Sequence, residues 1–241
     1  LLAYGARVIR VDGTYDDAFE LSLAATREFG WYNRNTAYNP YMSEGKKTVA
    51  FEVCEQLAWS APDVIFVPVG DGCIIGGVHK GFKDLLALGW IEKMPRIMGI
   101  QATGSSPLVD AWERGLEGWE MEPVEAHSVA DSIVAGLPRD RIKALRAVRE
   151  SGGSFLRVDD DAIVAAIPAL AQGCGVFAEP AAAAAYAGLV QAMDRGLVST
   201  EESVVVLATG SGLKDIATAM KSTGEPTIVE PDLADVRRAI G

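Results

Sequence analysis

The sequence predicts an α/β fold with a mainly parallel sheet and helices on both faces. The apolar run Asp63–Val69 (DVIFVPV) is typical of a central parallel strand buried on both faces, and Ser203–Ala208 (SVVVLA) is expected to be a second fully apolar strand. Segments with helical spacing of apolar residues alternate with the expected strands along the chain. This alternation is the pattern of βαβ units, and a Gly-rich turn follows each of the two apolar runs.

The first quarter of the chain predicts one strand and two helices. Ala6–Val11 is expected to be a strand, and Asp12-Gly13 a turn. Tyr15–Phe29 carries apolar residues at helical spacing. A polar, proline-containing connection is expected over Asn33–Gly45, and a second helix over Lys47–Trp59. Since the chain enters its first strand without an initiator Met, we expect it to be trimmed at this end.

The remaining elements follow the same alternation after the buried strand at 63–69. The expected order is a helix at Ile74–Leu88, a strand at Arg96–Gln101, helices at Pro107–Gly115 and Asp140–Ser151, a strand at Phe155–Val158, and helices at Asp159–Gln172 and Pro180–Arg195. Asp159 or Asp160 is a suitable N-cap, and Pro180 is at the first turn of its helix. The segment Trp119–His127 is expected to be a surface loop. After Asp215 the tail turns polar and is expected to be loosely held.

Composition excludes several functional classes. The chain of 241 residues has 22 Lys and Arg against 33 Asp and Glu, a net charge of −11, which disfavours binding to nucleic acid or to anionic membranes. A hydrophobic content of 49% and a charged content of 23% predict a soluble globular protein. Three scattered cysteines fit a reducing, cytoplasmic compartment, and the cysteines and two histidines show no metal-ligand spacing. We therefore expect a small-molecule partner and no metal.

The turn after the first buried strand, Gly70-Asp71-Gly72-Cys73-Ile74, is a candidate phosphate cradle. A Gly-rich turn between a strand and a helix exposes backbone N–H groups, and the helix dipole adds positive potential there. The sequence lacks the Lys-Ser/Thr ending of a nucleotide P-loop and the full dinucleotide fingerprint. A tight turn that needs glycine only for its backbone angles explains the motif equally well.

A second candidate is Thr209, which ends the other apolar strand and precedes Gly210-Ser211-Gly212. Because ligands of parallel sheets lie beyond the carboxyl ends of the strands, both turns are candidate site walls. The Thr209 hydroxyl can offer a neutral hydrogen bond to a ring nitrogen, although an ordinary strand end explains it too. Glu179, before the helix that begins at Pro180, either complements the helix dipole or lies near a cofactor ring.

The order of the motifs resembles threonine synthase and, more broadly, the fold-type II (tryptophan synthase β-like) pyridoxal-phosphate enzymes. The matching motifs are Asn39-Pro40 with Glu44-Gly45-Lys46-Lys47-Thr48, Val67–Gly72, Gly175–Ala181 and Thr209–Asp215. The resemblance implies pyridoxal 5′-phosphate as cofactor, a phosphate loop at Gly70, Asp71, Gly72, Cys73 and Ile74, and Thr209 at the pyridine nitrogen. It also implies an amino-acid substrate and a homodimer.

The same resemblance implies three regions. Residues 1–32 would be a remnant of the small mobile domain, 33–220 the large cofactor-binding domain and 221–241 a C-terminal tail. The family's Schiff-base lysine lies in a Ser-x-Lys-x-Arg context that this chain lacks. We expect that lysine upstream, in a segment on the order of a hundred residues. No catalytic residue is therefore assigned within this chain, and we expect the 241 residues alone to bind the cofactor weakly and to be inactive.

The substrate is less well defined. The resemblance implies an Arg after Asn39-Pro40 that grips the phosphate of O-phosphohomoserine, but Met42 stands in that place. Arg34, with Asn35 and Thr36, is the candidate replacement. Three hypotheses follow: a threonine synthase that forms threonine and phosphate, a dehydratase or ammonia-lyase acting by β-elimination on threonine, serine or a diamino acid, and a non-catalytic relative. A Ser-x-Lys-x-Arg motif upstream would exclude the third.

Overall fold

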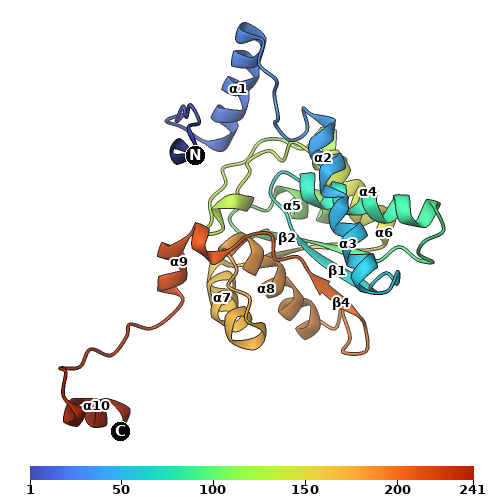
Figure 1. Ribbon diagram of the computed structural model, residues 1–241. Helices are drawn as coiled ribbons and strands as arrows, with labels where there is room; N and C mark the ends of the chain where they lie inside the picture. Colours follow the sequence, from blue (N-terminus) through green and yellow to red (C-terminus); the bar gives the residue numbers. More distant parts are fainter.

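The computed structural model describes residues 1–241 and contains one four-stranded parallel sheet between two layers of helices (Figure 1). The strand order is β3-β2-β1-β4. The strands are β1 (Val64–Pro68), β2 (Arg96–Ala102), β3 (Ser154–Val158) and β4 (Val204–Val206). The predicted fold class, a mainly parallel sheet with helices on both faces, is confirmed.

Ten α-helices accompany the sheet. They are α1 (Tyr15–Phe29), α2 (Pro40–Lys46), α3 (Thr48–Gln56), α4 (Cys73–Ala87), α5 (Pro107–Glu113), α6 (Arg141–Ser151), α7 (Asp160–Cys174), α8 (Pro180–Asp194), α9 (Ile216–Lys221) and α10 (Leu233–Ile240). Short 3₁₀ turns are at Leu2–Tyr4, Gly118–Glu120, Asp131–Ile133 and Gly212–Lys214. None of the helices combines the length and the apolar content that a bilayer crossing would need.

The central strand β1 explains the two-layer arrangement. All five of its residues are buried, and its side chains alternate between two separate cores. Val64 and Phe66 pack into a core shared with α7 and α8. Ile65 and Val67 pack into a core shared with α3, α4, α5 and α6. Because both faces are covered, the strand is one continuous apolar run, and the predicted burial on both faces is confirmed.

Two predicted strands differ from the structure. Ala6–Val11 forms no strand and is mostly exposed, because no neighbouring strand of the chain pairs with it. The second apolar run, predicted as a strand over Ser203–Ala208, forms a strand only at Val204–Val206. This strand β4 lies at the sheet edge and pairs with β1 alone, which leaves its residues half-buried.

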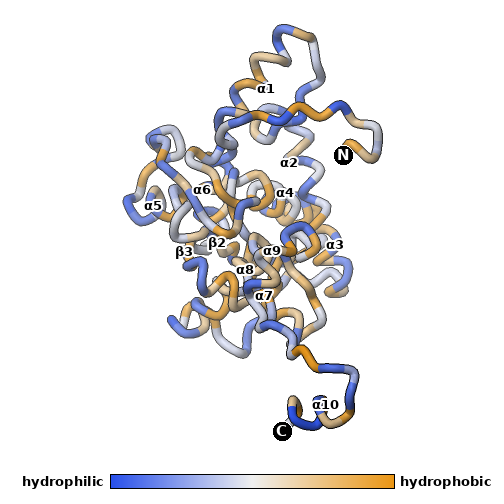
Figure 2. Tube along the Cα trace, turned by 90° about the vertical axis from the view of Figure 1, so that its left-hand side faces the viewer, coloured by the Kyte–Doolittle hydropathy of each residue, from blue (hydrophilic) through white to orange (hydrophobic).

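Three helices were not predicted. The expected polar connection at Asn33–Gly45 contains α2, which begins at Pro40 with Asn39 as its N-cap. The tail contains α9 and α10, and α10 lies away from the sheet at the end of an extended segment (Figures 1 and 2). Its apolar residues Leu233 and Ile240 are exposed. The polar composition of these segments therefore did not indicate a helix, although capping residues and local apolar spacing are present in them.

The buried histidine of α4 predicts a loss of stability in mild acid. His79 is 4% exposed, and burial lowers the pKa of its imidazole despite Glu150 Oε2 at 3.3 Å. The unfolded chain then binds more protons than the folded one below about pH 6.5, so the free energy of unfolding falls as the pH drops through that range. We expect His79→Gln to flatten this slope between pH 7.5 and 5.5, measured by urea denaturation. His127→Gln, at the exposed second histidine, is the control for loss of an imidazole; a slope unchanged in His79→Gln would contradict the prediction.

Candidate functional site

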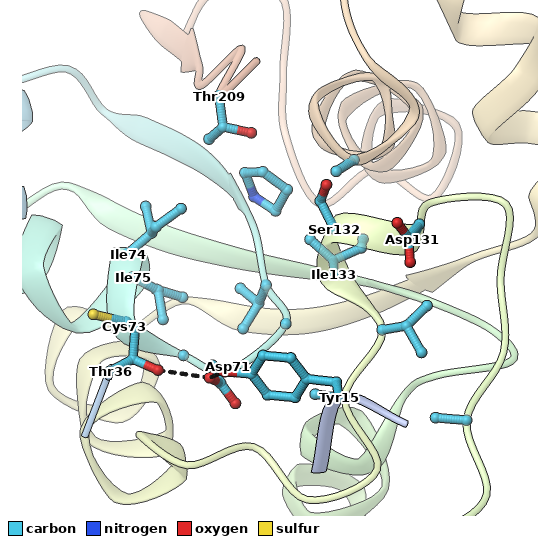
Figure 3. Close-up of a pocket in the computed structure, with 18 of the residues that line it drawn as sticks. Tyr15, Thr36, Asp71, Cys73, Ile74, Ile75, Asp131, Ser132, Ile133 and Thr209 are labelled. Atoms are coloured by element: carbon cyan, nitrogen blue, oxygen red, sulfur yellow. Dashed lines mark hydrogen bonds between the residues drawn. The ribbon is translucent and has the colours of Figure 1, made fainter. Parts of the chain in front are cut away.

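A cavity lies beyond the carboxyl ends of β1 and β4, where ligands of parallel sheets bind. Its volume is about 770 Å³, within the range of small-molecule sites. It is lined by the turn after β1, the 3₁₀ turn at Asp131–Ile133, the start of α8, Thr209 and parts of the N-terminal segment (Figure 3). The cavity thus draws on segments from nearly the whole length of the chain.

The turn Gly70–Ile74 forms one wall and presents unpaired amides. Gly72 is the N-cap of α4 with φ 89°, a left-handed conformation that favours glycine, and no side chain caps the helix. The N–H groups of the turn and of the first helical residues donate to no protein oxygen. Free N–H groups at the start of a 15-residue helix are a suitable cradle for a phosphate. Ile133 closes over the turn, since a Cβ on Gly70 would lie 2.9 Å from its Cα.

Thr209 lies on the opposite side of the cavity from Asp71 and Tyr15 (Figure 3). Its side chain is exposed to the cavity and has no hydrogen-bond partner in the protein. Beside it, Glu179 is 5% exposed and forms an ion pair of 2.6 Å with Lys214. The structure therefore brings the two predicted stretches, Gly70–Ile74 and Thr209, to one cavity. These residues fit a ligand that carries a phosphate at one end and a hydrogen-bonding ring at the other.

The acidic side chain of the turn is directed into a protein network. Asp71 Oδ2 accepts hydrogen bonds from the Tyr15 hydroxyl and from Thr36 Oγ1, the latter at 2.6 Å, and Oδ1 accepts from the backbone N–H of Arg139 at 3.0 Å. Burial and the Asp71 carboxylate raise the pKa of the Tyr15 phenol well above its usual value, so the phenol stays a donor. Three donors thus hold the carboxylate whose charge would oppose a bound phosphate.

The three candidate substrate residues have different places. Thr36 lines the cavity and binds Asp71. Arg34 and Asn35 are not among the lining residues. The Arg34 guanidinium is exposed, with Nη2 3.5 Å from Met42 Sδ, and Asn35 Nδ2 donates to Ser22 Oγ at 2.6 Å. Of the three, only Thr36 is brought to the cavity.

Lys46 was not singled out from the sequence but lines the cavity. It ends α2, and its ammonium donates to the Met42 carbonyl at 3.1 Å without a carboxylate partner. Lys214, the other cationic residue of the lining, is paired with Glu179. The approach of α2 to α4 depends on Gly77, where a Cβ would lie 2.6 Å from Lys46 Cβ. In the sequence, the only sign of this contact is the pair Gly77 and Gly81, one helical turn apart. Such a pair indicates that another helix packs closely there, but it does not indicate which helix.

Cys73, at the first position of α4, is 3% exposed. Burial raises the pKa of its thiol despite the ammonium of Lys46 nearby. A buried thiol with a raised pKa is a poor nucleophile at neutral pH, so this side chain serves packing while its backbone N–H belongs to the turn.

Comparison with known sequences gives the relationship. The family model described as "Pyridoxal-phosphate dependent enzyme" matches residues 1–210. Threonine synthase of Methanocaldococcus jannaschii is 38% identical over 238 residues, which are 98% of this chain and 58% of the relative. Threonine synthase of Mycobacterium tuberculosis (strain ATCC 25618 / H37Rv) is 38% identical over 239 residues, which are 99% of this chain and 63% of the relative. The chain thus spans about three fifths of the length of these relatives.

Solved structures share the fold at lower sequence identity. Diaminopropionate ammonia lyase from Escherichia coli matches 92% of this chain and 60% of its own with a TM-score of 0.73 at 16% identity. Threonine deaminase isoform 2 from Solanum lycopersicum matches 92% of this chain and 60% of its own with a TM-score of 0.71 at 22% identity. The cavity, the family match and the curated relatives agree with the cofactor expected from the sequence. The chain belongs to the pyridoxal-phosphate dependent enzyme family.

Proposed function

We propose that the protein is a pyridoxal-phosphate-dependent lyase of the threonine synthase type, which converts O-phosphohomoserine and water to threonine and phosphate. The observation that carries the proposal is that the unpaired amides of Gly70–Ile74 and the free hydroxyl of Thr209 lie on one cavity. The identity of 38% with threonine synthases along 98% of the chain supports this reaction over others of the family. We also propose that it acts as a cytoplasmic homodimer.

In this proposal the chain divides the binding of the cofactor between two walls. The N–H groups of Gly70, Asp71, Gly72, Cys73 and Ile74 hold the phosphate, with the Lys46 ammonium at the same side of the cavity. The Thr209 hydroxyl meets the ring nitrogen. When bound, the cofactor supplies an electron-withdrawing ring that stabilises negative charge on the substrate. A neutral hydroxyl leaves the ring nitrogen largely unprotonated, which makes the ring a weaker electron sink than an aspartate partner would.

We assign no Schiff-base lysine within the 241 residues. Lys214 and Lys46 are the two lysines on the cavity wall. Lys214 is neutralised by Glu179, and Lys46 lies against the helix that starts at the phosphate turn. We propose that a lysine outside these 241 residues supplies the base. Residues 1–32 are proposed to belong to a small domain and 33–220 to the cofactor-binding domain.

A second candidate function is β-elimination by a dehydratase or ammonia-lyase. Met42 carries no charge, and Arg34 is not on the cavity wall, which leaves a phosphorylated substrate without an arginine partner among the lining residues. Asp131 and Ser132, exposed on that wall, are polar groups of the kind that bind a hydroxy- or diamino acid.

A pair of assays on the protein expressed from its full reading frame separates the two. With O-phosphohomoserine, release of phosphate together with threonine is expected; with threonine, serine or 2,3-diaminopropionate, release of ammonia with the corresponding 2-oxo acid is the signature of the second function. We expect kcat/KM for O-phosphohomoserine to exceed that for threonine at least about tenfold, equivalent to about 1.4 kcal/mol of transition-state binding. The reverse order would replace the proposed reaction with the second one.

A further inference from the structure

The Asp71 carboxylate joins three segments that are far apart in the sequence. Tyr15 is the first residue of α1, Thr36 lies in the loop before α2, and Arg139 precedes α6. The backbone of Asp71 adds a fourth link, because its carbonyl accepts the N–H of Asp140 at 2.8 Å. The acidic residue of the turn Gly70–Ile74 is therefore also the residue through which α1 contacts that turn (Figure 3).

Helix α1 is also tied to the loop that follows it, because Asn33 Nδ2 donates to Thr26 Oγ1 at 2.8 Å and Asn35 Nδ2 to Ser22 Oγ at 2.6 Å, but its apolar contact with the body of the protein is small. Phe19 is its only buried residue. The Arg139 guanidinium lies 4.4 Å from the Phe19 ring centroid and pairs with Asp16 at 2.7 Å and Glu20 at 2.9 Å. With so small an apolar contact, polar contacts at Asp71 and Arg139 carry much of the docking of α1. Arg139 and Asp71 are themselves joined through the Arg139 N–H.

The charge of Asp71 makes this arrangement consequential for a ligand. A free carboxylate at the turn would repel a phosphate held by the same amides. The hydrogen bonds from Tyr15, Thr36 and the Arg139 N–H engage both carboxylate oxygens and stabilise their charge within the protein. Release of α1 removes the Tyr15 donor and leaves the carboxylate with two of its three hydrogen bonds.

We propose that Tyr15 and Asp71 are positioning residues which couple the docking of α1 to the binding of a phosphate monoester at the turn Gly70–Ile74. The inference rests on the proposed role of that turn as the cofactor's phosphate site. Coupling of this kind is reciprocal. A phosphate ligand at the turn should hold α1 in place. Loss of the Tyr15 hydroxyl should in turn weaken the binding of that ligand, although this hydroxyl donates to Asp71.

The test compares wild type, Tyr15→Phe and the control Tyr38→Phe in the protein expressed from its full reading frame. Hydrogen exchange of residues 15–29 and the dissociation constant for pyridoxal 5′-phosphate are measured, with inorganic phosphate as a second probe. In wild type and in Tyr38→Phe, at an exposed tyrosine, the cofactor is expected to slow exchange of α1 at least about fivefold. In Tyr15→Phe the slowing should fall below about twofold, and the dissociation constant should rise about tenfold.

A double-mutant cycle separates the pair from a general loosening of the structure. In an Asp71→Asn background, Tyr15→Phe should change the dissociation constant much less than it does in wild type, because the two residues act through one hydrogen bond. Equal effects in both backgrounds, or cofactor binding that leaves the exchange of α1 unchanged in wild type, would overturn the coupling. Failure of wild type to bind the cofactor at all would instead overturn the proposed function.

Discussion

Gly72→Ala is expected to lower the free energy of unfolding by about 2–4 kcal/mol and to weaken cofactor binding at least about tenfold. Two costs add. Gly72 has φ 89°, a conformation that costs an alanine about 1 kcal/mol or more. The added Cβ would lie 2.9 Å from Ala144 Cβ and 3.1 Å from the Asp140 carbonyl oxygen, an overpacking that typically costs 1–3 kcal/mol. Relief of that clash moves the turn away from α6 and disperses the amides of the cradle.

Gly115→Ala separates the two costs. Gly115 also has a positive φ, 68°, but a Cβ there would meet no atom within 4 Å. Its substitution therefore measures the backbone cost alone, about 1 kcal/mol, and should leave cofactor affinity unchanged. Urea denaturation of both variants gives the difference due to packing, and spectroscopic titration with pyridoxal phosphate gives the affinity. Equal destabilisation by the two variants, or cofactor affinity retained in Gly72→Ala, would show that the turn is not held as the structure indicates.

The parts of the fold that the sequence predicted are those with local signals. The continuous apolar run Asp63–Val69 predicted β1. Helical spacing of apolar residues, with Pro180 in the first turn, predicted α8. Gly-rich turns after apolar runs located both walls of the cavity. The errors have physical causes: Ala6–Val11 has strand-like residues but no pairing strand, and Ser203–Ala208 is apolar although its strand lies at the sheet edge. Neither pairing nor edge position is encoded within a short segment.

The candidate site shows the same division between local and long-range information. Thr209 and the turn at Gly70–Ile74 were found because each follows a strand directly in the sequence. The contacts of Asp71 with Tyr15 and Arg139 span 56 and 68 residues, and no local pattern links such partners. Arg34 was chosen for its charge and because it is close to Met42 in the sequence, yet it does not line the cavity. Lys46, which lies one turn after Met42 in α2, does line it.

Lys46→Gln is expected to raise the dissociation constant for pyridoxal 5′-phosphate about tenfold. The ammonium of Lys46 is half-buried, has no carboxylate partner and lies on the cavity that begins at the N-terminus of α4. A charge-assisted contact to a phosphate is worth about 1.5–3 kcal/mol, and partial exposure reduces it toward the lower end, where 1.4 kcal/mol equals a factor of ten. Glutamine keeps the length and polarity of the side chain but removes the charge.

Lys47→Gln is the matched control one residue along the chain. The Lys47 ammonium pairs with Glu44 at 2.7 Å and Asp84 at 3.1 Å and is not among the lining residues of the cavity, so its loss should leave cofactor affinity within about twofold of wild type. Titration with inorganic phosphate at rising salt gives a second readout, because loss of the Lys46 charge should reduce the salt dependence of binding. If Lys46→Gln and Lys47→Gln bind the cofactor equally well, the phosphate is held by the amides alone, as the Gly-rich turn by itself would predict.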